Sequence, residues 1–117
     1  MCIFCKIVDG EIPSNKVLEN DDFIAFHDIN PSAPIHVLVI PKKHVDCFQE
    51  FSAEDMAKAT PFIQEVTRKL GLDETGYRLV TNNGSDGGQE VLHLHFHILG
   101  GGKLKWHHYH DDPKKAI

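Results

Sequence analysis

The stretch Val91-Leu92-His93-Leu94-His95-Phe96-His97-Ile98-Leu99 decides how this chain folds, because three histidines alternate in it with large apolar residues. Successive side chains of a β-strand point to opposite faces of the sheet. We therefore expect His93, His95 and His97 to share one face, while the apolar residues between them enter a core. A strand whose polar face only met solvent would more commonly carry Lys, Thr or Glu at these positions.

Two kinds of chemistry use a row of three imidazoles. The histidines can hold a zinc ion that activates water. Alternatively, one histidine can be a nucleophile whose neighbours position it and bind an anionic substrate. Neutral imidazole is a good nucleophile toward phosphorus near neutral pH, since its ordinary pKa is about 6.5. The residues around the row have to decide between these two chemistries.

The composition indicates one domain of ordinary size. The chain has 117 residues, is 41% hydrophobic and carries a formal net charge of −5. Such a charge gives no general attraction to nucleic acid, although a local site can still bind a nucleotide-sized anion. No apolar run is long enough to span a membrane, and the N-terminus lacks the pattern of a signal peptide. We expect a cytoplasmic protein with reduced cysteines and with neither nucleic acid nor membrane as partner.

The remaining pattern predicts an α+β domain built on a five-stranded antiparallel sheet with one main helix. Apolar runs bounded by turn residues predict strands at 16–19, 23–26, 36–40 and 77–81 and along the histidine row. Ser52 is a typical helix N-cap, and apolar residues at helical spacing continue from it to Leu70, just before Gly71. Pro61 predicts a kink or a break in this helix. Residues 2–8 are expected to form a further short helix.

A glycine-rich loop directly precedes the histidine row. Gly84, Gly87 and Gly88 permit backbone conformations in which several N–H groups converge on an anion. The loop matches neither the P-loop nor the dinucleotide-binding glycine pattern, so an ordinary turn is the alternative. Its place beside the histidines favours phosphate binding.

A second constellation lies at the N-terminus, where Cys2 and Cys5 form a Cys-x-x-Cys motif. In a reducing compartment this motif indicates a metal site or a redox pair. Zinc needs two more ligands, and His44 and His93 are available for a closed Cys2His2 structural site. If His93 serves there, the row divides into one structural histidine and two chemical ones.

Histidines outside the row allow two interpretations each. His36 begins an apolar strand and is either a satisfied core residue or a partner that orients a catalytic imidazole. His107, His108 and His110 lie in a polar C-terminal segment, whose composition favours a solvated tail over a weak metal site.

These motifs together resemble those of a known family. The pattern His-φ-His-φ-His-φ-φ from His93 to Leu99 is similar to the signature of the histidine triad (HIT) family. Further matches run in order through residues 4–7, 10–13, 25–29, 39–44 and 84–89. Within the family the chain most resembles the histidine triad nucleotide-binding proteins, which are purine nucleoside phosphoramidases. We accordingly expect a single HIT domain at residues 1–106 and a polar tail at residues 107–117.

The resemblance implies a homodimer whose two sheets join into one, with a nucleotide site in each protomer. It implies hydrolysis of the P–N bond in adenosine or guanosine 5′-phosphoramidates, which releases AMP or GMP and an amine. His95 would be the nucleophile that forms a nucleotidyl-histidine intermediate, His97 would hydrogen-bond the phosphate, and His36 would orient or assist His95. The resemblance also implies structural zinc bound by Cys2, Cys5, His44 and His93.

The same resemblance implies where a purine nucleotide would bind. Asp28 would hold the ribose hydroxyls, and Asn82 with the backbone of residues 88–91 would hold the phosphate. The expected nucleotide-binding residues are Phe4, Ile7, Phe26, Asp28, Ile29, Asn82, Gly88, Gln89, Glu90, Val91, His95 and His97. Some family members carry a phosphate-contacting serine where this chain has Glu90, whose carboxylate would repel a phosphate unless it is protonated or turned away.

Three other functions are alternatives on the sequence alone. The chain could hydrolyse dinucleoside polyphosphates at a P–O–P bond. It could instead be a nucleotide-binding regulatory module whose slow hydrolysis is incidental. A zinc hydrolase with the three histidines of the row as ligands is the weakest alternative, because the row holds no acidic general base and the cysteines are better zinc ligands.

Overall fold

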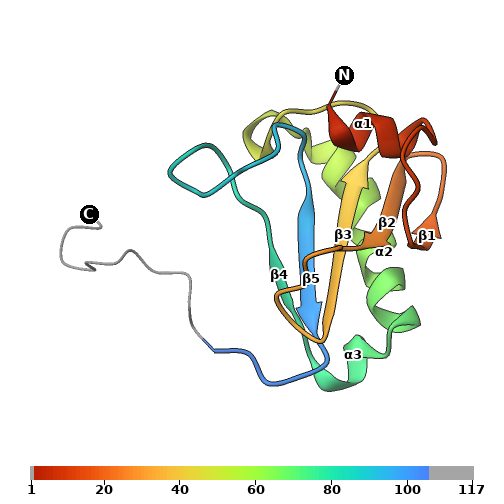
Figure 1. Cartoon of the computed structure of the whole chain (residues 1–117), viewed down its shortest axis with the longest axis vertical. Coiled ribbons are helices and arrows are strands. Elements are labelled where there is room, and N and C mark those ends of the chain that lie inside the picture. Colours follow the sequence, from red (N-terminus) through yellow and green to blue (C-terminus); the bar gives the residue numbers. More distant parts are fainter. Residues whose placement is uncertain (1, 106–117) are drawn as a thin grey trace.

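The structure is a computed structural model that describes residues 2–105. Its elements are α1 (Ile3–Val8), β1 (Lys16–Glu19), β2 (Phe23–His27), β3 (Ile35–Pro41), the 3-10 helix η1 (Phe48–Glu50), α2 (Ala53–Lys69), α3 (Leu72–Thr75), β4 (Arg78–Val80) and β5 (Phe96–Gly100). The five strands form one antiparallel sheet in the order β1-β2-β3-β5-β4 (Figure 1). The α+β class, the five-stranded sheet, the main helix and the short N-terminal helix are thus confirmed.

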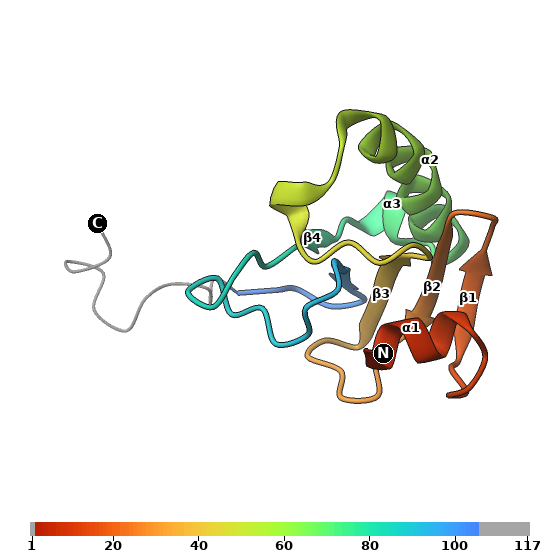
Figure 2. The same ribbon diagram turned by 90° about the horizontal axis from the view of Figure 1, so that it is seen from above.

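The sheet is covered on both faces. Seen from above, α2 lies on one side of the sheet and α1 on the other (Figure 2). Alternate residues of β2 divide between two clusters: Phe23 and Ala25 pack in the core under α2, whereas Ile24 and Phe26 pack beside α1. A strand buried on both faces has to be apolar along its length, which explains why β2 reads as a continuous apolar run.

The histidine row keeps the expected alternation of its side chains. The apolar residues between the histidines are buried in the core under α2: Leu94, Phe96 and Ile98. The imidazoles lie on the α1 side, where the Phe4 ring meets His93 and His95 edge-on at centroid distances of 5.8 and 5.0 Å. The polar side of this segment is therefore enclosed by the protein.

Only the second half of the row is a β-strand, which differs from the sequence-based expectation. The ladder between β3 and β5 ends where Val39 pairs with Phe96. Two residues further along β3 stands Pro41, which has no N–H to continue the pairing. The N–H of Leu94 donates instead to the carbonyl of Val45 at 2.6 Å. His93 and His95 consequently sit in an extended segment just before β5.

The main helix α2 begins and ends as the sequence predicts. The Ser52 hydroxyl accepts the N–H of Asp55 at 3.0 Å, and Gly71 follows the helix with a φ of 75°. Pro61 lies inside α2 without ending it, so a break at this position is excluded. The apolar residues that continue past it, including Phe62 and Val66, remain buried against the sheet.

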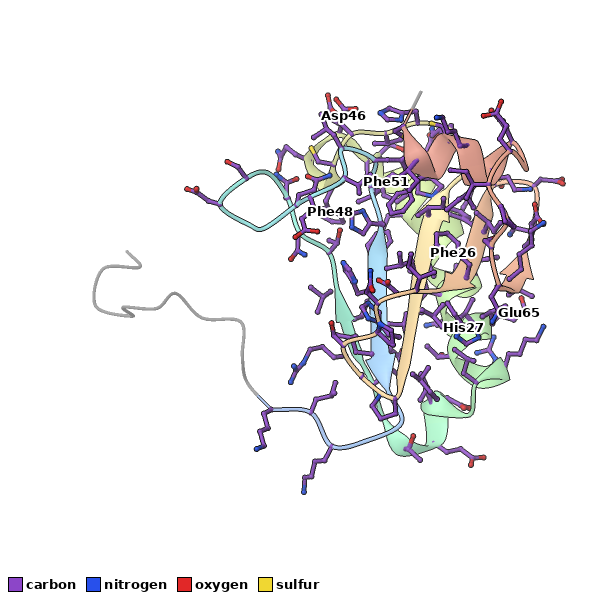
Figure 3. All side chains as sticks on the ribbon, viewed as in Figure 1. Phe26, His27, Asp46, Phe48, Phe51 and Glu65 are labelled. Atoms are coloured by element: carbon purple, nitrogen blue, oxygen red, sulfur yellow. The ribbon has the colours of Figure 1, made fainter. Side chains whose placement is uncertain are left out.

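Two short helices were not predicted, η1 and α3. They contain three and four residues, too few to show a helical repeat in the sequence. The segment around η1 closes one end of the core: the rings of Phe48 and Phe51 pack against Phe96 at centroid distances of 6.4 and 6.2 Å (Figure 3).

Two further expectations concern the ends of the chain and membranes. The expected tail at residues 107–117, with His107, His108 and His110, lies outside the described residues. Within residues 2–105, no helix is long and apolar enough to cross a bilayer.

Candidate active site and metal cluster

A cleft of about 730 Å³ opens on the α1 side of the sheet, a volume typical of sites for small molecules. Apolar side chains of α1, β2 and β3 supply much of its lining, among them Phe4, Phe26 and Leu38. Phe26 and its neighbour His27 occupy the last positions of β2 (Figure 3). Its polar groups include the imidazoles of His95 and His97. The cleft therefore combines an apolar surface with two neighbouring imidazoles.

Most of the expected nucleotide-binding residues line this cleft. They are Phe4, Ile7, Phe26, Asp28, Ile29, Glu90, Val91, His95 and His97. The exceptions are Asn82, Gly88 and Gln89, which do not contribute to the lining of the cleft.

The glycine-rich loop uses its polar groups to hold its own shape. The Gln89 side chain accepts the N–H of Gly84 at 2.9 Å and donates to the carbonyl of Asp46 at 2.6 Å. The N–H of Gly88 donates to the carbonyl of Ser85. The N–H groups of Gly84 and Gly88 are therefore occupied within the loop itself. The expected binding of phosphate by the backbone of residues 88–91 stays a prediction.

The proton position on His95 follows from its one hydrogen bond. Its Nδ1 lies 2.8 Å from the carbonyl oxygen of His93, and a carbonyl can only accept. Nδ1 therefore carries the proton, and Nε2 of a neutral ring has a free lone pair. Thr81 fixes the backbone at this point by donating its hydroxyl to the His95 carbonyl at 2.9 Å. His95 is thus held in the tautomer in which Nε2 can attack an electrophile.

Two successive hydrogen bonds fix His97 in the other tautomer, with its proton on Nε2 instead of Nδ1. The N–H of Ser32 donates to Nδ1 of His36 at 2.9 Å, which leaves the ring proton of a neutral His36 on Nε2. That Nε2–H donates to Nδ1 of His97 at 2.9 Å. The proton of a neutral His97 therefore lies on Nε2. His97 is a hydrogen-bond donor next to His95, with the two ring centroids 5.0 Å apart.

Burial keeps this pair of histidines neutral. Desolvation lowers the pKa of His97 to about 4, and the neighbouring His95 and His36 add to this effect. Desolvation likewise lowers the pKa of His36, although Asp28 works against the change. Both rings are therefore uncharged at neutral pH, which is the condition for the proton positions given above.

His36 differs from its sequence-based expectation in the ring that it orients. The family resemblance implies that His36 orients or assists His95, whereas its hydrogen bond goes to His97. The register explains this, because His97 pairs with Leu38 and His36 lies two residues away on the same face of β3. Asp28 lies beside this pair, with its Oδ2 3.5 Å from Nε2 of His36.

The row does not form a three-histidine metal site. Two groups of side chains within residues 2–105 bring three or more ligand atoms together, and neither group includes His95. One of them consists of Asp28, His36 and His97. Its two imidazole nitrogens are 2.9 Å apart, closer than the roughly 3.3 Å that separates two nitrogens on a tetrahedral zinc ion. This group is a hydrogen-bonded relay, and the geometry disfavours the zinc-hydrolase alternative.

The second group is the predicted cluster of two cysteines and two histidines. Cys2 and Cys5 lie at the start of α1, and their sulfur atoms are 3.3–3.7 Å from Nδ1 of His44 and His93. Four ligands at zinc distances of about 2.0–2.3 Å in a tetrahedron are separated by about 3.3–3.8 Å. The donor types and spacings therefore fit zinc, and the cluster could hold such a metal.

In both imidazoles of this cluster, a hydrogen bond from Nε2 leaves the Nδ1 lone pair available to a metal. Nε2 of His93 lies 2.9 Å from the carbonyl of Pro41, and Nε2 of His44 lies 2.7 Å from the carboxylate of Asp46. Each Nε2 therefore carries the proton, and each Nδ1 lone pair faces the sulfurs. Such partners fix the orientation of histidine ligands in metal sites.

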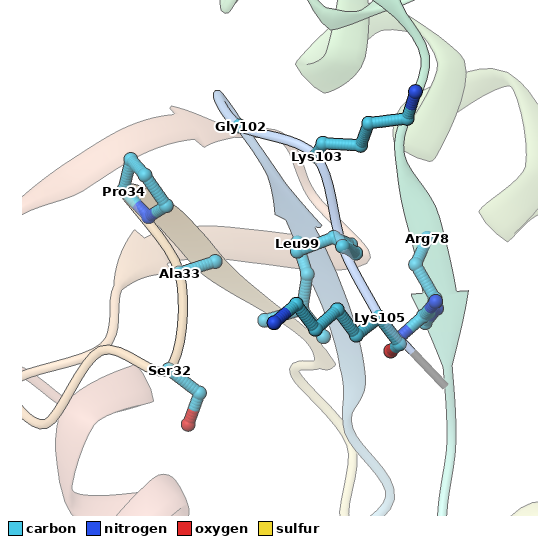
Figure 4. A pocket seen from close by; sticks show the side chains of 9 residues that line it. Ser32, Ala33, Pro34, Arg78, Leu99, Gly102, Lys103 and Lys105 are labelled. Carbon is cyan, nitrogen blue, oxygen red and sulfur yellow. The ribbon is translucent and has the colours of Figure 1, made fainter. Parts of the chain in front are cut away.

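A second hollow, of about 460 Å³, lies around Leu99 of β5 (Figure 4). Its charged lining residues are all basic: Arg78, Lys103 and Lys105. Among the described residues that line it there is no histidine, cysteine or carboxylate. It therefore has no pair of groups suited to nucleophilic or acid–base chemistry.

The cleft also has lining residues that the sequence pattern does not indicate: Ile3, Ile12, Pro13, Ser14, Asn15, His27 and Leu38. Leu38 could have been found, because it shares a strand face with His36. Residues 12–15 belong to no helix or strand, and no periodic signal marks them. Their place in the cleft depends on how the chain turns between α1 and β1.

The fold and the site define a small α+β protein whose sheet brings the imidazoles of His95 and His97 to a cleft on the α1 side. The sequence model of the HIT domain family matches residues 9–104. The chain therefore belongs to the HIT family. It is 55% identical over 103 residues to an uncharacterized HIT-like protein of Helicobacter pylori, a match that covers 88% of this chain and 99% of the relative.

Two solved structures illustrate the similarity. The crystal structure of a HIT family hydrolase from Legionella pneumophila has a TM-score of 0.82 and 46% identity, covering 91% of this chain and 97% of that one. A histidine triad nucleotide-binding protein from Candida albicans has a TM-score of 0.80 and 36% identity, covering 98% and 89%.

Proposed function

We propose that this protein hydrolyses the P–N bond of purine nucleoside 5′-phosphoramidates through a nucleotidyl-histidine intermediate. The observation that carries the proposal is the fixed tautomer of His95, whose Nε2 lone pair stands in the cleft beside the Nε2–H of His97. A nucleophile next to a neutral donor is the arrangement that displacement at phosphorus needs. The HIT family membership and the name of the Candida albicans neighbour support a nucleotide as the substrate.

The proposed reaction has two displacements. Nε2 of His95 attacks phosphorus, forming an N–P bond while the bond to the amine breaks, and the amine nitrogen takes a proton from solvent water as it leaves. Water then attacks the same phosphorus, the N–P bond to His95 breaks, and the proton of the attacking water returns to solvent. This second step releases the nucleoside monophosphate and restores neutral His95. In both steps His97 donates its Nε2–H to a phosphoryl oxygen, and His36 keeps that proton in place through its own bond to Nδ1.

The cleft offers matching surfaces for the rest of a nucleotide. The apolar residues Phe4, Ile7 and Phe26 would contact the purine base. The Asp28 carboxylate would accept hydrogen bonds from the ribose hydroxyls. A zinc ion bound by Cys2, Cys5, His44 and His93 would be structural, because its ligands form a closed set apart from the cleft.

Intact-protein mass spectrometry after rapid mixing with an adenosine 5′-phosphoramidate tests this proposal. We expect the wild-type chain to gain one adenylyl group transiently, and His95→Ala to gain none and to lose turnover by at least about a thousandfold. His27→Ala is the matched control, since it removes another imidazole from the same cleft and should still form the adduct. Turnover by wild type without any adduct would contradict a covalent mechanism.

Substrate competition separates the proposal from the two remaining alternatives. Faster cleavage of a diadenosine polyphosphate than of the phosphoramidate would favour the P–O–P hydrolase. Tight AMP binding with neither adduct nor turnover would favour the nucleotide-binding module. We expect the phosphoramidate to be the better substrate, because it carries less negative charge into a cleft lined by carboxylates.

A further inference from the structure

The charge of the cleft is unexpected for a site that binds a phosphate. Its lining contains two carboxylates, those of Asp28 and Glu90, and none of the described residues that line it is Lys or Arg. A single phosphate charge can be held by neutral N–H donors such as that of His97. Every further negative charge on the substrate would meet the carboxylates without a fixed cation to balance it.

The two carboxylates differ in how far their charge is already balanced. The side chain of Asp28 is 20% exposed; its Oδ1 accepts the N–H of Asn30 at 2.9 Å, and its Oδ2 lies 3.5 Å from Nε2 of His36. Glu90 is exposed, and within residues 2–105 no hydrogen bond or ion pair reaches its carboxylate. No described residue therefore competes with a bound group for the Glu90 carboxylate.

The leaving group is the part of the substrate that can respond to this charge. A nucleoside is uncharged and suits the apolar lining from α1, β2 and β3, while phosphorus has to lie at Nε2 of His95. The group beyond phosphorus is the part whose charge varies from one substrate to another. Glu90 stands on the segment that leads into the histidine row and lines the cleft together with His95 and His97.

We propose that Glu90 is a specificity-determining residue that selects phosphoramidates whose leaving amine carries a further positive charge, as in alkyl diamines. This inference rests on the proposed P–N hydrolysis. An ammonium group near an exposed carboxylate gains a screened attraction, and an anionic leaving group is repelled to a similar extent. Exposed pairs of this kind change a rate or binding constant by about two- to fivefold each.

Three adenosine 5′-phosphoramidates of nearly equal size test the inference, those of 1,2-diaminoethane, propylamine and β-alanine. While each amine is bonded to phosphorus, its remote end is cationic, neutral or anionic, respectively, at neutral pH. We expect Glu90→Gln to lower the ratio of kcat/KM for the diamine to that for β-alanine by about five- to tenfold relative to wild type. Glu90→Lys should invert the preference, and added salt should weaken it in the wild type. Comparing ratios between variants removes the intrinsic difference in reactivity among the three amines.

Asp86→Asn is the matched control, because Asp86 is an exposed acid of the same loop that does not line the cleft. It changes the net charge of the chain as Glu90→Gln does and should leave the ratio unaltered. An unchanged ratio in Glu90→Gln, or an equal loss on all three substrates, would overturn the selective role. Failure of the wild type to cleave any of the three would overturn the proposed function as well.

Discussion

At the scale of single residues, the site depends on where two protons lie. His95 carries its proton on Nδ1 because the His93 carbonyl accepts it, and His97 carries its proton on Nε2 because His36 donates to the other nitrogen. Neighbouring imidazoles in one row thus have opposite roles, one with a free lone pair and the other with a free N–H. The difference comes from the hydrogen bond of the remote nitrogen in each ring.

Removing the donor of His36 should impair the reaction without removing the nucleophile. We expect His36→Leu to lower kcat by about 10- to 100-fold, the usual loss when the partner that orients a functional imidazole is removed. KM should change less, because the lining of the cleft is retained. His36→Gln should recover part of the rate, since its amide N–H can donate to Nδ1 of His97. Equal rates for the two variants in single-turnover kinetics would show that this hydrogen bond has no such role.

Burial of neutral His97 should also make stability depend on pH. Its pKa is about 4 in the folded chain and about 6.5 when unfolded. The unfolded state therefore binds the proton more readily, and stability falls as pH decreases from about 6.5 through about 4. Between pH 7 and 4.5 the wild type should lose about 2 kcal/mol more than His97→Asn.

Urea unfolding of both proteins at the two pH values measures this difference. A chelator should be present throughout, so that acid-induced loss of a metal does not contribute. Parallel losses of stability in wild type and His97→Asn would contradict a depressed pKa for this ring.

At the scale of elements, α1 links the metal cluster to the cleft. Cys2 and Cys5 stand at its start, while Phe4 and Ile7 of the same helix line the cleft. Six residues are too few for a helix to be stable alone. A zinc ion would therefore anchor one wall of the cleft as well as stabilise the fold.

Metal removal should consequently loosen α1 before it unfolds the chain. We compare the protein saturated with zinc to the same protein after a chelator has removed the metal. The chelated protein should have a free energy of unfolding lower by about 3 kcal/mol. Its Tm should be lower by about 10 °C for a chain of this size. Hydrogen exchange of the α1 amides should accelerate at the same time. Cys5→Ser should behave like the chelated protein, and Cys47→Ser, which lies outside the cluster, like wild type. Identical Tm values with and without chelator would mean that no structural zinc is bound.

Elements whose apolar residues recur at strand or helix spacing could be predicted from the sequence. Boundaries and contacts that depend on residues distant in the sequence could not. The strands and α2 follow from alternation and helical spacing. The start of β5 depends on Pro41, far away in sequence, which ends the ladder that the histidine pattern alone would continue. In the site, donor chemistry was enough to group Cys2 and Cys5 with two histidines. The partner of His36 depends on the register between β3 and β5, which no local pattern reveals.

At the scale of the whole molecule, the two edges of the sheet differ. The β1 edge carries charged side chains, with Lys16 and Glu19 paired at 3.1 Å, a common protection against further strand pairing. The β4 edge is short and follows Arg78 with two apolar residues, Leu79 and Val80. Leu79 lies opposite Ile98 and therefore points to the α2 face of the sheet. Nevertheless Leu79 is 43% exposed, and the neighbouring Tyr77 is 40% exposed. The β4 edge is therefore the better candidate for contact with a second copy.

A two-fold dimer that joins β4 to its own copy would make the two sheets continuous and cover these residues. In such an interface a residue near the axis meets itself, so Leu79→Lys would place two like charges together. Size-exclusion chromatography with light scattering should give twice the chain mass of 13.2 kDa for wild type and a shift toward 13.2 kDa for Leu79→Lys. Asp21→Asn adds the same charge at the other edge and should remain dimeric. A wild-type chain that stays at its single mass at tens of micromolar would contradict this dimer.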